Sequence, residues 1–256
     1  MSPTRGRHAG PDAAILCWTF DDFEEIQIEP DNGPAPTGSS AEAEQIGESR
    51  WPMAIAVLVL MTAALVAPPH LAIFPGWLLA SVEGLLLLAL IAGDPGRIDR
   101  TGPWQRRTSI ALVVVLLAST LGSTALLIYD LLTASPVTSQ ADQLLLAGAK
   151  VWLGNNVAFA FLYWEFDSGG PAVRAHGLPR YPDLAFPHQL NPDLALPGWR
   201  PQFLDYLYVA FTTANAFSPT DTMPMARWAK VAMGSQALIS FAVVGLVIAR
   251  AVNAFT

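Results

Sequence analysis

This sequence has few charged residues and almost no cysteine. Only 14% of its 256 residues are charged, against about 25% in an ordinary soluble domain. The single cysteine, Cys17, excludes an internal disulfide. The four histidines share no metal-ligand spacing, and there is no phosphate loop and no nucleophile elbow. We therefore expect no enzyme, no cofactor, no metal site and no nucleic-acid partner.

Hydrophobic residues make up 52% of the chain and occur in uninterrupted blocks. An apolar run of about twenty residues is long enough to cross a bilayer as a helix, because the hydrocarbon core is about 30 Å thick. Breaks such as Pro68-Pro69 and Asp94-Pro95-Gly96 separate the blocks. We predict an all-α membrane protein in the lipid bilayer with five transmembrane helices, at residues 52–67, 75–93, 108–132, 144–164 and 225–252.

The amino-terminal segment differs in composition from the rest. Residues 1–50 hold ten of the 21 acidic residues, together with several prolines. Such a composition buries too little apolar surface to fold alone, so we predict an acidic disordered tail and a candidate protein partner for it. The predicted units are the tail at 1–50, a three-span bundle at 51–143, and a module at 144–256 made of a span, a linker at 165–200, a short helix at 203–214, a turn at 215–224 and the last span.

The linker at 165–200 contains six prolines with large apolar residues between them. Regularly spaced prolines disfavour a helix and favour extended backbone. Two interpretations remain open for the apolar residues. They pack along a membrane-facing surface, or they are incidental members of a surface loop.

Basic residues indicate the orientation, because cytoplasmic loops are rich in Lys and Arg. With the amino terminus in the cytoplasm, twelve of the fourteen basic residues fall on the inner side. Only Arg250 falls outside, and Lys150 lies within a span. We predict a multi-pass protein of the bacterial inner membrane (plasma membrane) with a cytoplasmic amino terminus.

The carboxy-terminal part resembles the pore module of tetrameric potassium channels. A short amphipathic helix ending at Thr213 precedes a turn, and Asp221, Pro224 and Trp228 fall on the Asp, Pro and Trp of that family's pattern. The resemblance covers about residues 144–252 and implies a re-entrant short pore helix before the last span, a filter turn and an inner helix. On the charge count above, this turn faces the cytoplasm, whereas potassium channels hold theirs on the outer side.

The filter itself departs from the family. Ser218, Pro219 and Thr220 replace the Gly-Tyr-Gly triplet whose carbonyls dehydrate potassium. Proline fixes its own backbone and restricts the residue before it. We therefore expect no potassium filter. Hydroxyls of Ser218, Thr220 and Thr222, or a ring of Asp221 carboxylates, would form the constriction, and an acidic ring would favour cations.

A family of uncharacterised bacterial membrane proteins offers a second and closer resemblance. Membership implies no activity. The residues that carry it are Asp205, Leu207, Tyr208, Phe211, Thr212, the turn Thr220-Asp221-Thr222, Arg227, Ser240-Phe241 and Ala251-Val252-Asn253.

Two ionisable residues lie inside predicted spans, where charge is costly and often functional. Glu83 and Lys150 are at similar depth, since both spans start on one side and a helix rises about 1.5 Å per residue. We predict an ion pair that either locks two helices together or serves as a charge relay or gate.

The last span has a polar stripe at three-to-four spacing, and its residues are candidates for lining a conduit: Gln236, Ser240, Val243 and Val247. The alternative is that Gln236 and Ser240 bond a neighbouring helix, as we also expect for Asn155 and Asn156. Asp205 falls in the first turn of the short helix, where a carboxylate caps favourably.

Two functions follow. The first is a channel-like membrane protein that is not potassium-selective and conducts cations, which requires a homo-oligomer, a tetramer by analogy with the channels. The second is a non-conducting structural or regulatory membrane protein with a degenerate pore-loop fold.

Overall fold

The computed structural model describes residues 47–66, 74–98, 102–133, 141–216 and 221–255, and Glu44–Thr256 form one compact unit. The described chain is mostly helical, and four of its helices are long and apolar enough to cross a membrane. This agrees with the predicted all-α membrane protein. The predicted tail up to residue 46 lies outside the described residues.

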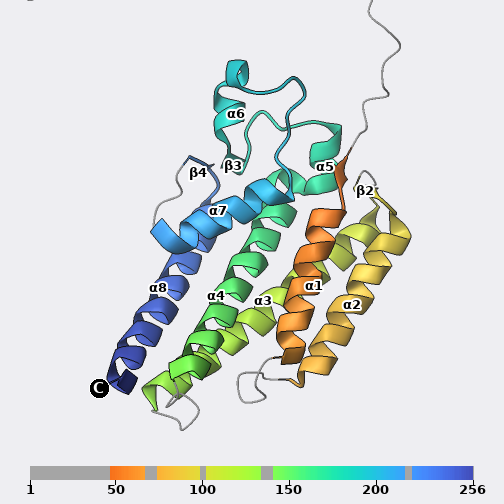
Figure 1. The fold of residues 1–256 in the computed structure, drawn as a ribbon. Helices are drawn as coiled ribbons and strands as arrows, with labels where there is room; N and C mark the ends of the chain where they lie inside the picture. Colours follow the sequence, from red (N-terminus) through yellow and green to blue (C-terminus); the bar gives the residue numbers. More distant parts are fainter. Residues whose placement is uncertain (1–46, 67–73, 99–101, 134–140, 217–220, 256) are drawn as a thin grey trace, which may run out of the picture. The chain divides into compact units, whose positions relative to one another are not determined.

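The helices follow the predicted blocks closely (Figure 1). They are α1 (Trp51–Val66), α2 (Gly76–Gly93), α3 (Pro103–Leu132), α4 (Ala141–Phe166), α7 (Phe203–Ala216) and α8 (Arg227–Phe255). The four long candidates are α2, α3, α4 and α8, whereas α1 has 16 residues and is shorter than they are. Helix α3 begins at Pro103, five residues before the predicted start, because proline suits the first helical position and its missing N–H costs nothing there.

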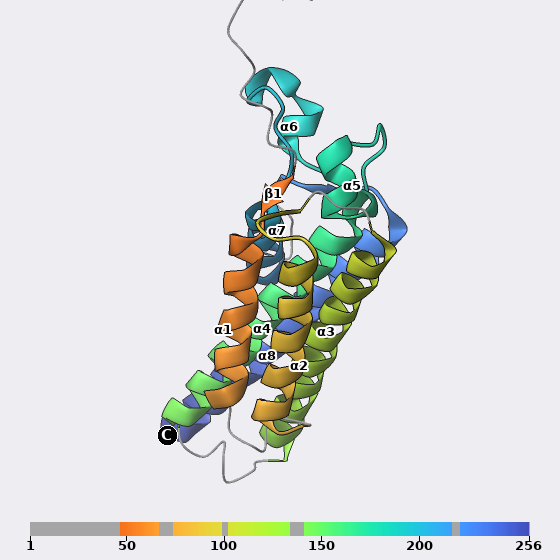
Figure 2. The same ribbon diagram turned by 90° about the vertical axis from the view of Figure 1, so that its right-hand side faces the viewer.

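Helix α4 is the centre of the bundle. It packs against α3, α7 and α8 and also touches α1, while α2 packs mainly between α1 and α3. Figures 1 and 2 show α7 lying across α4 and α8 near one end of the bundle. The buried fraction reflects this arrangement, since α4 has by far the largest share of buried residues among the four long helices. The other three turn much of their apolar surface outward, as lipid-facing helices do.

The contact between α4 and α8 depends on a glycine. A Cβ added at Gly148 would lie 2.9 Å from Cγ2 of Val247, a buried β-branched residue with a stiff side chain. We expect Gly148→Ala to push the helices apart and cost about 1–3 kcal/mol relative to Gly234→Ala.

The matched variant isolates packing from propensity. Gly234 lies in the interior of α8, as Gly148 lies in the interior of α4, but a Cβ at Gly234 meets nothing within 4 Å. Alanine has a higher helix propensity than glycine, and this gain is the same in both variants. The free energy of unfolding of each variant is measured by denaturation in mild detergent, with tryptophan fluorescence as the readout. Equal stability of the two variants would contradict close packing at Gly148.

Short elements gather at one end of the bundle. Strand β1 (Glu48–Ser49) pairs antiparallel with β2 (Arg97–Ile98), and β3 (Leu184–Ala185) pairs antiparallel with β4 (Met223–Pro224). We call this the basic end. Arginines from segments far apart in sequence lie at this end: Arg50, Arg97, Arg106, Arg174, Arg200 and Arg227.

Two predictions are wrong here, one on where the tail ends and one on the structure of the linker. The tail was expected to extend to residue 50, but β1 orders its last residues through pairing with β2. The linker at 165–200 was expected to contain no helix, yet it contains η4 (Asp167–Gly169), α5 (Pro171–His176), α6 (Pro187–Leu190) and η5 (Pro192–Leu194). The reason is that Pro171 and Pro187 occupy the first position of their helices, where proline starts a helix instead of breaking it.

Some apolar residues of the linker are buried and others are exposed. Phe186 is buried, and its ring lies 5.2 Å from the ring of Tyr206 and 5.9 Å from that of Trp199. Tyr181 and Leu194 are about four-fifths exposed, at 80% and 77%. The linker therefore packs onto α7 through Phe186, while Tyr181 and Leu194 on either side of it are surface residues.

Candidate functional site

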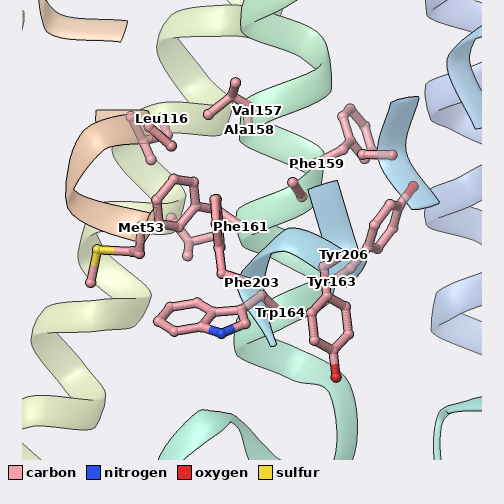
Figure 3. Close-up of a cluster of buried hydrophobic side chains, with 14 of the residues drawn as sticks. Met53, Leu116, Val157, Ala158, Phe159, Phe161, Tyr163, Trp164, Phe203 and Tyr206 are labelled. Carbon is pink, nitrogen blue, oxygen red and sulfur yellow. The ribbon is translucent and has the colours of Figure 1, made fainter. Parts of the chain in front are cut away.

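Aromatic side chains fix the start of α7 against the end of α4. The Phe203 ring lies 4.7 Å from the Phe161 ring and 5.8 Å from that of Trp164, both on α4 (Figure 3). Further along, Phe211 meets Trp152 edge-on at 5.7 Å. Trp152 is twelve residues before Trp164, a distance of about 18 Å along α4. Helix α7 thus runs from the basic end inward along α4.

Asp167 organises the polar part of this end. Its side chain is fully buried and accepts hydrogen bonds from the Tyr206 hydroxyl at 2.5 Å, the Ser168 hydroxyl at 2.9 Å and the Leu184 main-chain N–H at 3.1 Å. These donors come from α7, η4 and β3. One carboxylate therefore holds the linker to the pore-like helix.

Arg174 of α5 is buried beside it. Its Nη1 donates to the main-chain carbonyl oxygens of Trp164 at 2.8 Å and Asp167 at 2.6 Å, and its guanidinium carbon lies 4.8 Å from the centre of the Tyr206 ring. The Trp164 carbonyl lies in the last turn of α4, where main-chain carbonyls lack helical partners, and the Asp167 carbonyl in η4 also accepts from the Gly170 N–H at 2.9 Å. Arg174 thereby joins the end of α4 to the turn that follows it.

Glu48 ties the amino-terminal strand to α7. Its Oε1 accepts from Trp164 Nε1, and its Oε2 accepts from the Phe203 N–H at 3.0 Å, at the first residue of α7. Burial raises the pKa of Glu48 to about 7, although Arg174 nearby and the two hydrogen bonds lower it. At neutral pH this carboxyl is poised between its two protonation states.

A pocket of about 310 Å³ lies next to this cluster, where five segments meet. Two ion pairs stand in its walls. Arg50 Nη2 lies 3.3 Å from Asp94 Oδ2, and Arg106 Nη1 lies 3.3 Å from Glu165 Oε1. The remaining surface is largely apolar and includes Met53, Leu90, Ile98, Trp164, Ala172 and Val173.

The residues predicted to line a conduit are buried inside the single chain. Gln236 is 0% exposed, its Oε1 accepts from the Tyr163 hydroxyl of α4 at 2.6 Å, and its Nε2 donates to the Ala210 carbonyl of α7 at 2.8 Å. Ser240 accepts from Asn155 Nδ2 of α4 at 2.7 Å. The polar face of α8 therefore bonds α4 and α7, as the alternative interpretation held.

The two valines of the same stripe are buried as well. Val243 and Val247 belong to an apolar cluster formed by α3, α4 and α8, and the members of that cluster are Leu127, Leu131, Leu144, Ala147, Val151, Val243, Val247 and Ala251. Within one protomer these residues do not line a conduit. Three-to-four spacing shows that they share one face of α8, but it does not show whether that face contacts water or another helix.

The predicted ion pair between Glu83 and Lys150 is not formed within the described residues. Glu83 of α2 is buried, and its Oε2 has no hydrogen-bond partner in the part of the chain that the structure describes. Lys150 is half-buried on α4, and α2 packs mainly on α1 and α3. Equal depth is not sufficient for contact, because rotation about each helix axis also decides which residues face each other.

The predicted filter turn is only partly described. Ser218, Pro219 and Thr220 lie outside the described residues. Asp221 is exposed and Thr222 is buried. The predicted cap is confirmed, since Asp205 Oδ2 accepts from the Gln202 N–H at 2.7 Å, just before α7.

Comparison with known proteins gives no further constraint. No protein-family model, no curated protein and no solved structure matches this chain. The two resemblances seen in the sequence remain predictions.

Sequence reasoning missed the residues that dominate this end of the molecule. Asp167 and Arg174 were counted only as linker residues, and Glu48 only as part of the tail. A usable signal existed for the first of these. Glu165-Phe-Asp167 directly follows an apolar block, and carboxylates placed there must find donors at the end of the bundle.

Proposed function

We propose that this chain is an integral membrane protein whose pore-loop-like module is packed shut in each protomer, giving it a structural or regulatory role. The observation that carries this is Gln236, which joins α4, α7 and α8 through two hydrogen bonds. Asn155 and Ser240 bond below it. The polar side chains on this face of α8 are hydrogen-bonded to neighbouring helices, so they are not available to coordinate a hydrated ion.

The proposal keeps the re-entrant arrangement and five crossings by the apolar helices. Helix α7 runs inward along α4, while β4 pairs with β3 at the basic end and α8 starts there, with Trp228 6.1 Å from Phe166. An inward path and a return to the same end support a short re-entrant helix. The concentration of arginine at that end supports a cytoplasmic basic end in a bacterial inner membrane.

Cation flux from proteoliposomes tests this function. We expect no sodium or potassium flux above that of empty vesicles, across a range of voltages, from protein that is folded by tryptophan fluorescence. Asp221→Asn should behave identically, since Asp221 is exposed and a closed protomer conducts in neither form. Vesicles given a channel-forming peptide serve as the positive control. Flux that falls or changes selectivity in Asp221→Asn would overturn the proposal.

Conduction along the axis of an oligomer is the second candidate. The apolar outer faces of α7 and α8 favour it, because they would be covered in such an assembly: Leu204, Tyr208, Phe211, Leu238, Phe241 and Ile248 are each at least half exposed. The discriminating measurement is the subunit count in native mass spectrometry. A monomer ends this candidate, whereas a tetramer that conducts in the flux assay replaces the first proposal by it.

A further inference from the structure

We propose that the pocket between α1, α2, α3, α4 and α5 binds a compact zwitterion, a ligand with one amine and one acidic group on an aliphatic body. The inference goes beyond the proposed function and is independent of whether ions are conducted. Its basis is a cavity of about 310 Å³, which is at the small end of ligand sites and holds roughly ten water-sized groups.

Charge balance selects the ligand. The two ion pairs in the walls, Arg50 with Asp94 and Arg106 with Glu165, leave the pocket with no net charge. In a mostly apolar cavity an added anion or cation would be uncompensated, and burying such a charge is costly. A zwitterion adds no net charge, and each of its ends finds an opposite charge in the wall.

Arg106 provides the site for the acidic group. Its described contacts, with the Glu165 carboxylate and the main-chain oxygens of Glu165 and Gly169, all use Nη1. Nη2 and Nε therefore have no acceptor among the described residues, and the side chain is 37% exposed. Together these two nitrogens form the edge of a guanidinium that binds a carboxylate or phosphate through paired hydrogen bonds.

Glu165 provides the site for the amine. The residue is 1% exposed, and each carboxylate oxygen accepts one contact, from Arg106 on Oε1 and from the Ser109 hydroxyl on Oε2 at 2.5 Å. A carboxylate has about four acceptor positions, so two remain for an ammonium. Met53, Leu90 and Ile98 would contact the aliphatic body.

The geometry of the loop keeps Arg106 in place. Gly170 has φ +97°, and a Cβ there would lie 2.1 Å from Arg106 Nη1 and 2.9 Å from the Glu165 carbonyl oxygen. Only glycine allows the α4–α5 turn to close over the guanidinium in this way. The arginine is thereby held by backbone on one side, with its other edge open.

Binding can be measured on the full-length protein in detergent with glycerophosphoethanolamine as the probe, because its phosphodiester and its ammonium each carry one charge at neutral pH. Dimethyl phosphate and ethanolamine are the matched controls, since each carries one of these two charges. We expect calorimetric binding and a dose-dependent rise in Tm with glycerophosphoethanolamine, and at least a tenfold weaker response to either half. An equal response to dimethyl phosphate would overturn the proposal in favour of a simple anion site.

Two variants locate the response. Arg106→Gln should weaken binding at least tenfold, but it also removes the contacts to the α4–α5 turn. Val173→Trp avoids this difficulty, because Val173 is 45% exposed in the pocket wall and a larger side chain there narrows the cavity. Leu194→Trp is the matched control, exposed and outside the pocket. Equal binding by the two tryptophan variants would overturn the proposal.

A zwitterionic phospholipid headgroup has the same chemistry, and a second arm distinguishes it from a free solute. Tm is measured in nanodiscs of phosphatidylethanolamine and of phosphatidylglycerol, for the wild type and Val173→Trp. A rise specific to phosphatidylethanolamine and lost in Val173→Trp, without a response to free glycerophosphoethanolamine, assigns the site to lipid. Absence of any response in both arms overturns the proposal.

Discussion

Replacing Asp167 with alanine is expected to lower the free energy of unfolding by about 4 kcal/mol. The fully buried carboxylate accepts from Tyr206, Ser168 and Leu184. A hydrogen bond to a charged group contributes about 1.5–3 kcal/mol, and the contributions are not additive. Alanine would leave the Leu184 N–H and the Tyr206 hydroxyl buried without acceptors. Denaturation in mild detergent, followed by tryptophan fluorescence, measures the loss.

A control in the same linker separates this network from any general effect of losing an acidic residue. Asp193 of η5 is exposed, so Asp193→Ala should change stability by no more than about 0.5 kcal/mol. Tyr206→Phe completes a double-mutant cycle, in which Asp167→Ala should cost less when the phenol is already absent. If Asp167→Ala matches Asp193→Ala, this carboxylate does not hold the linker to α7.

The helices could be predicted because the bilayer imposes a length. Each apolar block that the sequence bounds with Pro or Gly became a helix within a few residues of its predicted ends. Helix α7 could be predicted from its amphipathic pattern and from Asp205, whose capping bond the structure contains. These features are local, so a single chain read in order is enough to find them.

Contacts between distant segments could not be predicted in the same way. Gln236 was recognised as a polar residue on one face of the last span, but the sequence does not state that Tyr163 and the Ala210 carbonyl meet it. The error over Glu83 and Lys150 has the same origin, since depth was known and helix rotation was not. Partners 26 to 85 residues apart are set by packing, as the bonds from Gln236 to Ala210 and from Asn155 to Ser240 illustrate.

Glu48 contacts α7 in a way that its sequence context did not predict. It belongs to a segment whose composition predicts disorder, yet β1 pairs with β2 and carries its carboxylate to the first residue of α7. An acceptor at a helix amino terminus satisfies an N–H that has no partner within the helix. The amino-terminal segment is thereby connected to the pore-like helix through a titratable group.

Stability should therefore fall between pH 5 and pH 8 through Glu48. Burial raises its pKa in the folded protein to about 7, against an ordinary value of 4.5 for an exposed glutamate. The folded state holds the proton more tightly, so this contribution is complete below pH 4.5 and is lost as pH rises through 7. This difference between the pKa values of the folded and unfolded states corresponds to about 3 kcal/mol. Arg174 and Asp205 also act on this carboxyl.

Glu48→Gln isolates this effect, because glutamine has nearly the same shape and does not titrate. The free energy of unfolding of the wild type minus that of the variant should fall by about 3 kcal/mol from pH 4.5 to above pH 7 and then level off. The difference cancels every other titrating group, since both proteins share them. A difference that stays constant over this range would mean that Glu48 ionises normally in the folded protein. The carboxyl would then be solvated, and its two hydrogen bonds to Trp164 and Phe203 would not hold β1 to the pore-like helix.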